Sequence, residues 1–132
     1  RGDEYDQRVR IRIEPGGRAS ASYYVEVLQG RRRLIEVAAQ RMAGLDSFIM
    51  PTVPTVPPTI SSFDDDDRDY YSKQNLLSLR NTSIGNFLDS CSISIPASGP
   101  GQPPVGVMLM AGPMDDEKLF AVARTVEQAI AS

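Results

Sequence analysis

The sequence predicts an α/β fold in which short β-strands pack against flanking α-helices. Two kinds of periodicity carry this prediction. Residues 92–95 alternate Ser and Ile, and residues 105–110 place Val105, Val107 and Leu109 at every second position, which is the period of a β-strand. Residues 19–44 repeat apolar side chains at steps of three and four, the period of an amphipathic helix. At 132 residues, the chain has the length of one domain, and we expect a single segment over 1–132.

A wide loop is predicted between the two strand-like runs. Residues 96–104 contain four prolines and two glycines, and proline can neither donate to a strand ladder nor change its φ angle. We therefore expect an antiparallel hairpin. The second run is apolar on both faces, so helices are expected on both sides of the sheet. Cys91, at the start of the first strand, is expected to be a small core residue, because nothing near it in the sequence would stabilise a thiolate.

The upstream elements are predicted in order. Residues 9–13 alternate apolar and basic side chains before Pro15 and Gly16, and this pattern fits either a strand or the end of a short helix. The long helix of residues 19–44 has Gly44 as a plausible C-cap. A short strand over residues 46–50 follows, and four prolines within residues 51–58 predict an extended, polyproline-like exit from it.

The downstream half begins with four consecutive aspartates at 64–67, which we interpret as a solvated loop, because a cation site favours interleaved ligands and a glycine turn. Residues 71–80 predict a helix. Residues 82–90 predict a second short helix, capped by Asn81 or Thr82. The last element is an amphipathic helix over residues 115–130, whose first residues are acidic and so favour the helix macrodipole.

Composition excludes several classes of partner. A formal net charge of -3 and a pI near 4.9 argue against nucleic acid, because a phosphate backbone requires a clustered positive surface. No apolar run approaches the roughly 18 to 20 residues that span a bilayer, so no membrane segment is expected. A single cysteine rules out an internal disulfide and makes a cytoplasmic location the default.

The residue inventory also limits the chemistry. The chain has no histidine, so it cannot assemble a Ser-His-Asp triad, a Cys-His pair or an imidazole metal ligand by itself. Its lysines, Lys73 and Lys118, have polar neighbours, whereas a lysine that acts as a base needs desolvation or a nearby cation to lower its pKa. We therefore expect no catalytic residue, no metal ligand and no cofactor in this chain.

Several short landmarks occur in a recognisable order. They are Arg12-Ile13, Tyr23-Tyr24, Arg32, Leu45-Asp46, Pro51-Thr52-Val53-Pro54, Asn86-Phe87, Ser92-Ile93-Ser94-Ile95-Pro96, Pro104-Val105-Gly106-Val107 and Glu127. Over nearly the whole chain, this succession resembles the C-terminal part of the amidase signature family. The resemblance implies the C-terminal part of the amidase signature fold, with short strands of a mixed β-sheet and flanking α-helices. It also implies an amidohydrolase that cleaves a small carboxamide through an acyl-enzyme, using a Ser, cis-Ser, Lys triad and an oxyanion hole.

The family's Gly/Ser-rich signature and its catalytic lysine and serine motifs belong to the N-terminal portion of its members, and nothing in this chain matches them. The resemblance therefore implies a segment that lacks the catalytic centre, is inactive alone, and supplies part of the substrate pocket and of the sheet. Two alternatives stay open. One is the glutamine-hydrolysing A subunit of a tRNA-dependent amidotransferase, and the other is a non-enzymatic binding domain.

Three residues are candidate substrate contacts by this resemblance. Arg12 stands where glutamine-using relatives place an arginine that pairs with a substrate carboxylate, a role that suits a planar bidentate donor; an ion pair on the protein's own surface is the alternative. Thr52 follows a strand end that points toward the family's active site, or simply forms a turn. Asn86 could line the pocket or cap a helix. The acidic residue with which amidotransferase relatives recognise the substrate's amino group has no clear match here.

A chain that contains only part of a large sheet is expected to expose strand edges and apolar surface. We therefore predict self-association, most simply as a symmetric dimer.

Overall fold

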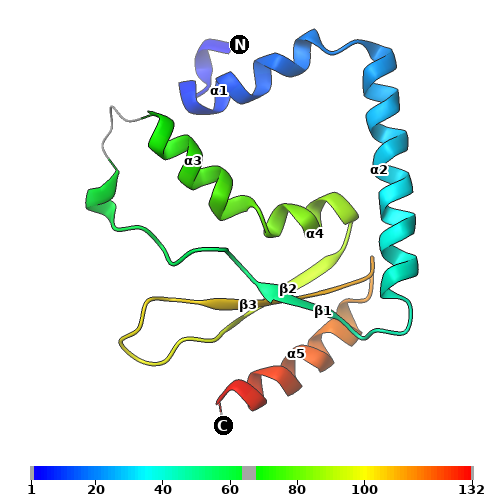
Figure 1. Cartoon of the computed structure of the whole chain (residues 1–132), viewed down its shortest axis with the longest axis vertical. Helices are drawn as coiled ribbons and strands as arrows, with labels where there is room; N and C mark the ends of the chain where they lie inside the picture. The colour runs from blue at the N-terminus through cyan, green and yellow to red at the C-terminus, as the bar shows by residue number, and fades with distance from the viewer. Residues whose placement is uncertain (1, 64–67, 132) are drawn as a thin grey trace.

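The computed structural model describes residues 2–63 and 68–131, so the four aspartates at 64–67 lie outside the described residues. Within the described residues, α-helices alternate with the strands of one small sheet (Figure 1). The predicted α/β class is confirmed. The elements are η1 (Gly2–Glu4), α1 (Gln7–Ile13), η2 (Glu14–Arg18), α2 (Ala21–Met42), β1 (Phe48–Pro51), η3 (Ile60–Ser62), α3 (Arg68–Leu79), α4 (Thr82–Leu88), β2 (Cys91–Pro96), β3 (Gly106–Ala111) and α5 (Asp116–Ala131).

The sheet has the order β1-β3-β2, and both pairings are antiparallel. β2 and β3 form the predicted hairpin with its wide loop. The register places Ile93 opposite Leu109, and Leu109 opposite Ile49 on the other side. Side chains alternate between the two faces of each strand, so this register decides which residues face α5 and which face α4.

The face that packs against α5 forms the hydrophobic core. Ile95, Leu109 and Ala111 from the sheet meet Leu119 and Ala123 from α5, and Leu109 is only 1% exposed. The period-two pattern of the strands and the helical period of α5 thus come together on one interface. Half-buried residues surround the core, among them Cys91, which packs against it and donates from Sγ to the Gly112 carbonyl at 3.2 Å. The prediction of a core role for Cys91 is confirmed.

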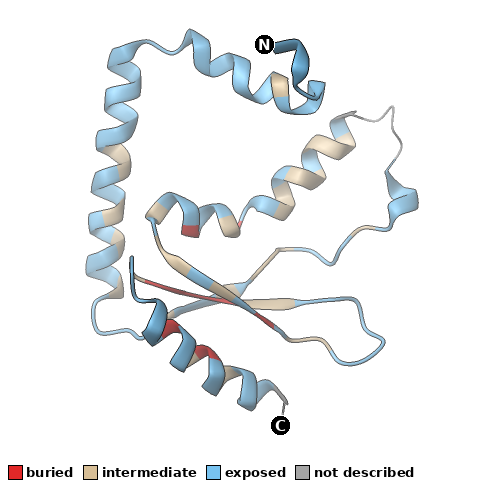
Figure 2. Ribbon diagram, turned by 180° about the vertical axis from the view of Figure 1, so that it is seen from behind, coloured by how far each residue is buried: buried red, intermediate tan, exposed pale blue. Residues whose placement is uncertain are grey.

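The opposite face of the sheet packs against α4. Met108 and Met110 are buried there, and a Cβ atom added at Gly85 of α4 would lie 2.9 Å from Ser92 Oγ and 3.2 Å from Met110 Sδ. Only glycine allows the helix to approach this closely. Helices therefore cover both faces of the sheet, as expected, and the buried residues concentrate on β3 and α5 (Figure 2).

The N-terminal half of the chain is helical. Residues 9–13 lie in α1, so the helix interpretation was correct and the strand interpretation was wrong. The reason is local, because Asp6 caps the helix by accepting a hydrogen bond from the Arg8 backbone N–H at 2.8 Å. α2 begins after Ser20, whose hydroxyl accepts from the Tyr23 N–H at 3.1 Å, and it is followed by Gly44 with φ +84°. The C-cap is Ala43, so the predicted C-cap Gly44 lies one residue beyond it. Glycine tolerates the left-handed angle found there.

The predicted capping of α4 by a side chain was wrong. Asn81 occupies the N-cap position, but its side chain makes no capping hydrogen bond. The Thr82 hydroxyl donates to the Leu79 carbonyl at 3.2 Å and so does not cap the helix either. Asn81 instead bonds to a residue at the end of β1, which brings it into the site described next.

Candidate functional site

Three polar or small residues meet where the strands of the sheet end. Thr52 directly follows β1, Ser94 lies within β2, and Gly106 begins β3. The Thr52 backbone N–H donates to the Gly106 carbonyl at 2.8 Å, and Thr52 Oγ1 lies 2.6 Å from Ser94 Oγ. We refer to these three residues as the strand-end cluster. Thr52 is half-buried and Ser94 is exposed, so the hydroxyl pair is accessible from one side.

Gly106 provides the space that the hydroxyl pair occupies. A Cβ atom built at this position would lie 2.6 Å from Ser94 Oγ and 2.7 Å from Thr52 Oγ1. Both distances are far below van der Waals contact, so any larger residue would push the two hydroxyls aside. A glycine inside a strand often marks such a close approach.

Asn81 holds the end of β1 in place. Its side chain is 8% exposed, and Nδ2 donates to the Pro51 carbonyl at 2.8 Å. On its other side, Oδ1 accepts from Arg80 Nε at 3.3 Å. The Pro51 carbonyl immediately precedes Thr52, so the buried amide of Asn81 fixes the backbone from which the Thr52 hydroxyl projects. Sequence reasoning missed this role, because the partner lies thirty residues upstream.

The Pro/Gly-rich loop beside the cluster is ordered by its own hydrogen bonds. The Ala97 N–H donates to the Val105 carbonyl at 2.8 Å, and the Val105 N–H donates to Ser98 Oγ at 3.3 Å. Farther out, the Gly99 N–H donates to Gln102 Oε1 at 3.1 Å. These bonds extend the hairpin beyond Gly106, so the loop forms a defined rim next to the strand-end cluster.

Arg12, another of the three predicted site residues, lies outside the strand-end cluster. It is exposed on α1, which lies on the far side of α3 and α4 from the sheet (Figure 1). Among residues 2–63 and 68–131, no salt bridge joins Arg12. Arg10, two residues earlier, forms ion pairs with Glu14 and Asp3 instead. Its Nη1 lies 2.7 Å from Asp3 Oδ1. The hydrogen bonds that Arg10 donates to Glu14, first, and to Asp3 raise the pKa of Arg10 above its usual value.

The third predicted residue, Asn86, is exposed within α4. The capping interpretation was wrong, since the caps of α4 are Asn81 and Asp89, the latter with φ 55°. The Asn86 carbonyl accepts a hydrogen bond from Arg31 Nη2 at 3.5 Å, and the same guanidinium pairs with Asp89. The structure therefore places Thr52 in the strand-end cluster and keeps Arg12 and Asn86 outside it.

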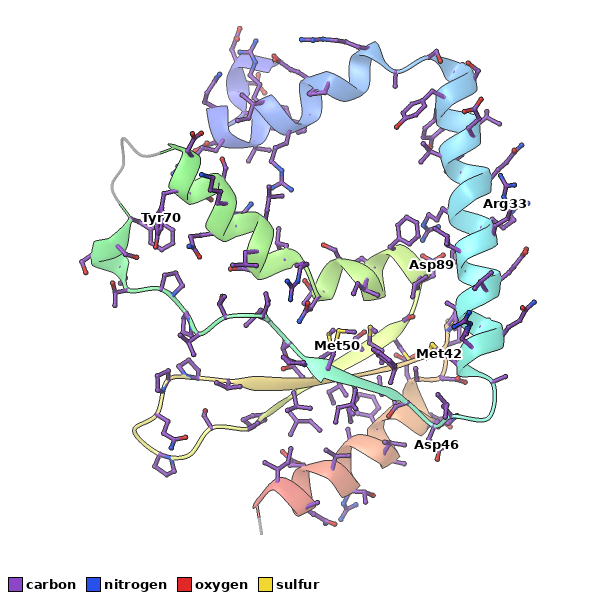
Figure 3. All side chains as sticks on the ribbon, viewed as in Figure 1. Arg33, Met42, Asp46, Met50, Tyr70 and Asp89 are labelled. Atoms are coloured by element: carbon purple, nitrogen blue, oxygen red, sulfur yellow. The ribbon has the colours of Figure 1, made fainter. Side chains whose placement is uncertain are left out.

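A separate hollow of about 300 Å³ lies at the other end of the sheet, between α2, α4 and the start of α5. Lys118 is at its edge, where Nζ donates to the Leu45 carbonyl at 3.2 Å and lies 3.6 Å from Asp46 Oδ1. Figure 3 shows Asp46 just past the lower end of α2. Lys118 is exposed and paired with an acid, and Lys73 is exposed on α3. Neither lysine is buried.

Neither a metal centre nor a membrane span is found in the described part of the chain. Across residues 2–63 and 68–131, no three His, Cys, Asp or Glu side chains come together as a metal-binding group. Within the same residues, no helix is both long enough and apolar enough to cross a membrane.

Comparison with known proteins decides the family. A family model described as amidase matches residues 1–120. The chain belongs to the amidase family. The resemblance seen in the order of landmarks is thereby confirmed, and the small sheet with its flanking helices is consistent with part of the amidase fold. No solved structure matches the chain.

Curated relatives of this amidase-family chain are much longer than it is. The chain is 28% identical over 129 residues to a 2-amino-5-chloromuconic acid deaminase of Comamonas testosteroni, covering 97% of this chain and 28% of that protein. It is 29% identical over 133 residues to the glutamyl-tRNA(Gln) amidotransferase A subunit of Halobacterium salinarum, covering 97% of this chain and 30% of that protein. The same amidotransferase polypeptide from Sulfurisphaera tokodaii is 27% identical over 135 residues, with 98% and 28% covered. The chain thus spans less than a third of these relatives.

Proposed function

We propose that this chain is the C-terminal part of an amidohydrolase that cleaves the carbon-nitrogen bond of a small carboxamide through an acyl-enzyme. The observation that carries the proposal is the amidase family match over residues 1–120 in a chain that spans less than a third of its curated relatives. In this proposal the chain supplies part of the sheet and of the substrate pocket, and the nucleophile and its base come from the remainder of the enzyme.

The settings of the two lysines support a catalytic centre outside this chain. A triad that ends in lysine needs a neutral amine, and neutrality at ordinary pH requires burial or a neighbouring cation. Lys118 instead lies near the Asp46 carboxylate, and Lys73 is exposed. Neither side chain is buried, so neither has the environment that such a base requires.

The strand-end cluster supplies the substrate contact in this proposal. When one hydroxyl of the Thr52 and Ser94 pair donates to the other, the second hydroxyl keeps a free O–H donor, and both oxygens keep acceptor lone pairs. A carboxamide offers one carbonyl acceptor and N–H donors, so its hydrogen-bonding groups complement the pair. Asn81 holds the backbone ahead of Thr52, so the hydroxyl is positioned before substrate arrives. Preorganised polar groups bind a ligand at lower entropic cost.

A second candidate function is the glutamine-hydrolysing A subunit of a tRNA-dependent amidotransferase. Two of the relatives described above carry the name of that polypeptide. In this alternative the Arg12 guanidinium binds the α-carboxylate of glutamine, as a planar bidentate donor can. The lack of a matching acidic residue for the glutamine amino group favours a simple carboxamide instead. A cytoplasmic location suits both candidates.

The experiment is to purify the product of the complete gene and measure ammonia release from acetamide, propionamide, benzamide and L-glutamine. Thr52→Val is expected to lower kcat/KM about three- to tenfold, the value of one neutral hydrogen bond. Thr55→Val, which changes an exposed threonine of the same segment, serves as the control and is expected to stay within about twofold. Failure to hydrolyse any amide would contradict the proposal. Activity on glutamine alone, lost in Arg12→Ala, would establish the alternative.

A further inference from the structure

Arg80 is hydrogen-bonded to the residue that holds the strand-end cluster in place. It follows α3 directly, and its backbone N–H donates to the Leu77 carbonyl at 3.2 Å. Its side-chain Nε donates to Asn81 Oδ1 at 3.3 Å, and Asn81 Nδ2 donates to the Pro51 carbonyl at 2.8 Å. Two hydrogen bonds and the width of one amide group therefore separate the guanidinium from the backbone that carries the Thr52 hydroxyl.

The hydrogen bond at Nε leaves the end of the Arg80 guanidinium open. Arginine has N–H donors on Nε, Nη1 and Nη2, and within residues 2–63 and 68–131 only the Nε of this side chain has a hydrogen-bond acceptor. In the same part of the chain, no carboxylate forms a salt bridge with it. The side chain is exposed, so Nη1 and Nη2 are accessible to an anion from outside. Their N–H groups match the two oxygens of a carboxylate, which arginine binds bidentately.

The stretches that form and support the strand-end cluster carry no other charge. They are β1 with the chain after it, the end of α3 with α4, and the β2–β3 hairpin. Residues 47–63, 74–88 and 90–114 make up these stretches, and Arg80 is the one charged residue in them. A substrate anion at the cluster therefore meets a cation and no carboxylate from these stretches. A substrate ammonium group, in contrast, finds no acidic partner in them.

Arg12, the other arginine considered for a substrate carboxylate, is placed less favourably. It lies on α1, on the far side of α3 and α4 from the sheet (Figure 1). The hydroxyl pair lies at the sheet, where Thr52 Oγ1 is 2.6 Å from Ser94 Oγ. Arg80, between α3 and α4, is tied by hydrogen bonds to that end of the sheet. The geometry therefore favours Arg80 over Arg12.

We propose that Arg80 determines the substrate class of the amidase by binding a second group of the substrate, a carboxylate. The carboxamide lies at the Thr52 and Ser94 hydroxyls. The carboxylate, at the other end of a short carbon chain, accepts hydrogen bonds from Nη1 and Nη2 of Arg80. The substrate is then the monoamide of a small dicarboxylic acid without an amino group. This inference rests on the proposed function, because it names the substrate class of that same site.

The test measures kcat/KM for ammonia release by the product of the complete gene on two matched pairs of amides. Succinamate and glutaramate carry the carboxylate, whereas butyramide and valeramide have a methyl group in its place. The unmodified enzyme is expected to prefer each carboxylate over its neutral partner by about ten- to a hundredfold, the value of one charge-assisted hydrogen bond. Glutaramate is also expected to be preferred over L-glutamine, which differs from it only by the ammonium group. A preference for the neutral amides would overturn the proposal.

Arg80→Gln keeps a polar side chain but removes the charge and the bidentate donor. It is expected to lower kcat/KM on succinamate and glutaramate by about ten- to a hundredfold, and to lower it much less on butyramide and valeramide. Arg80→Lys restores the charge without the planar donor and is expected to recover part of the loss. The control is Arg33→Gln, because Figure 3 shows Arg33 on the side of α2 that faces away from α4. It is expected to stay within about twofold on all of these amides.

Two results with these variants would overturn the proposal. Equal losses on the carboxylates and the neutral amides in Arg80→Gln would show that Arg80 only supports Asn81. A loss confined to the carboxylates in Arg12→Gln, with Arg80→Gln unaffected, would assign the substrate carboxylate to Arg12.

A binding measurement separates this inference from the proposed function. Glutarate is titrated into the gene product by calorimetry, and its Kd is expected to rise about ten- to a hundredfold in Arg80→Gln, with the fold of the variant checked by circular dichroism. In the unmodified protein the Kd is expected to rise with salt concentration, because salt screens an exposed charge. A gene product that hydrolyses no amide but binds glutarate through Arg80 would contradict the proposed function and support the anion site. A Kd that is equal in Arg80→Gln and independent of salt would overturn this inference.

Discussion

Replacing Gly106 by alanine tests whether the strand-end cluster is as closely packed as the structure indicates. The new Cβ would lie 2.6 Å from Ser94 Oγ, 2.7 Å from Thr52 Oγ1 and 3.2 Å from Thr52 Cβ. Neither hydroxyl can keep its position, so the 2.6 Å contact between them is lost.

The cost follows from three contributions. Losing one neutral hydrogen bond costs about 0.5–1.5 kcal/mol, and overpacking costs about 1–3 kcal/mol. Exchanging glycine for alanine inside a strand stabilises the folded state by about 0.5–1 kcal/mol, because alanine loses less backbone entropy on folding. We therefore expect Gly106→Ala to lower the free energy of unfolding by about 0.5–4 kcal/mol, combining these contributions.

The assay is urea denaturation of the 132-residue chain followed by far-ultraviolet circular dichroism, with the m-value unchanged between variants. Gly30→Ala is the control, because a Cβ at that helical position meets nothing within 4 Å; it should stabilise by about 0.5–1 kcal/mol. Adding Ser94→Ala to Gly106→Ala removes the closer clash and should recover about 1 kcal/mol or more as a coupling energy. A Gly106→Ala variant as stable as the parent, or no coupling with Ser94→Ala, would refute the packing argument.

Three further predictions concern the buried amide of Asn81, the Arg31 and Asp89 ion pair, and self-association. Asn81→Ala leaves the last carbonyl of β1 without its buried donor and should lower the free energy of unfolding by about 1–3 kcal/mol in urea denaturation. The control is Asn86→Ala, at an exposed position of α4, which should change it by no more than about 0.5 kcal/mol. Equal effects of the two substitutions would contradict the assigned role of Asn81. Arg31→Ala breaks the partly exposed ion pair with Asp89 and should lower the free energy of unfolding by about 0.2–1 kcal/mol, and by less at 1 M salt. Arg33→Ala is the control and should change this free energy little. A loss of stability that does not depend on salt would argue against an ion pair. The 132-residue chain should self-associate at micromolar concentration, as its exposed apolar surface suggests, and light scattering that gives a monomer mass throughout would disprove this.

Periodicity predicted the elements whose burial alternates regularly. The strands around Ile93 and Leu109 and the stripe of α5 were found because one face of each is buried in the core. Residues 9–13 were ambiguous, since five alternating residues fit two periods. The deciding interaction is the Asp6 cap, which lies outside that pattern.

Contacts between distant residues could not be predicted in the same way. Local rules made Asn81 a helix cap, but its amide bonds to Pro51 across thirty residues. The glycine in Pro104-Val105-Gly106-Val107 was visible as part of a motif, yet nothing in the sequence said which hydroxyls fill the space beside it. The order of landmarks likewise could not give the distances that separate Arg12 and Asn86 from Thr52.

The most direct test of the proposed function is amide hydrolysis by two purified proteins, the product of the complete gene and the 132-residue chain, on the same carboxamides. We expect a gene product of larger mass that releases ammonia, and a 132-residue chain that is inert at equal molar concentration. Hydrolysis by the 132-residue chain alone, abolished in Lys73→Ala or Lys118→Ala, would contradict the assignment of the catalytic groups to the remainder of the enzyme.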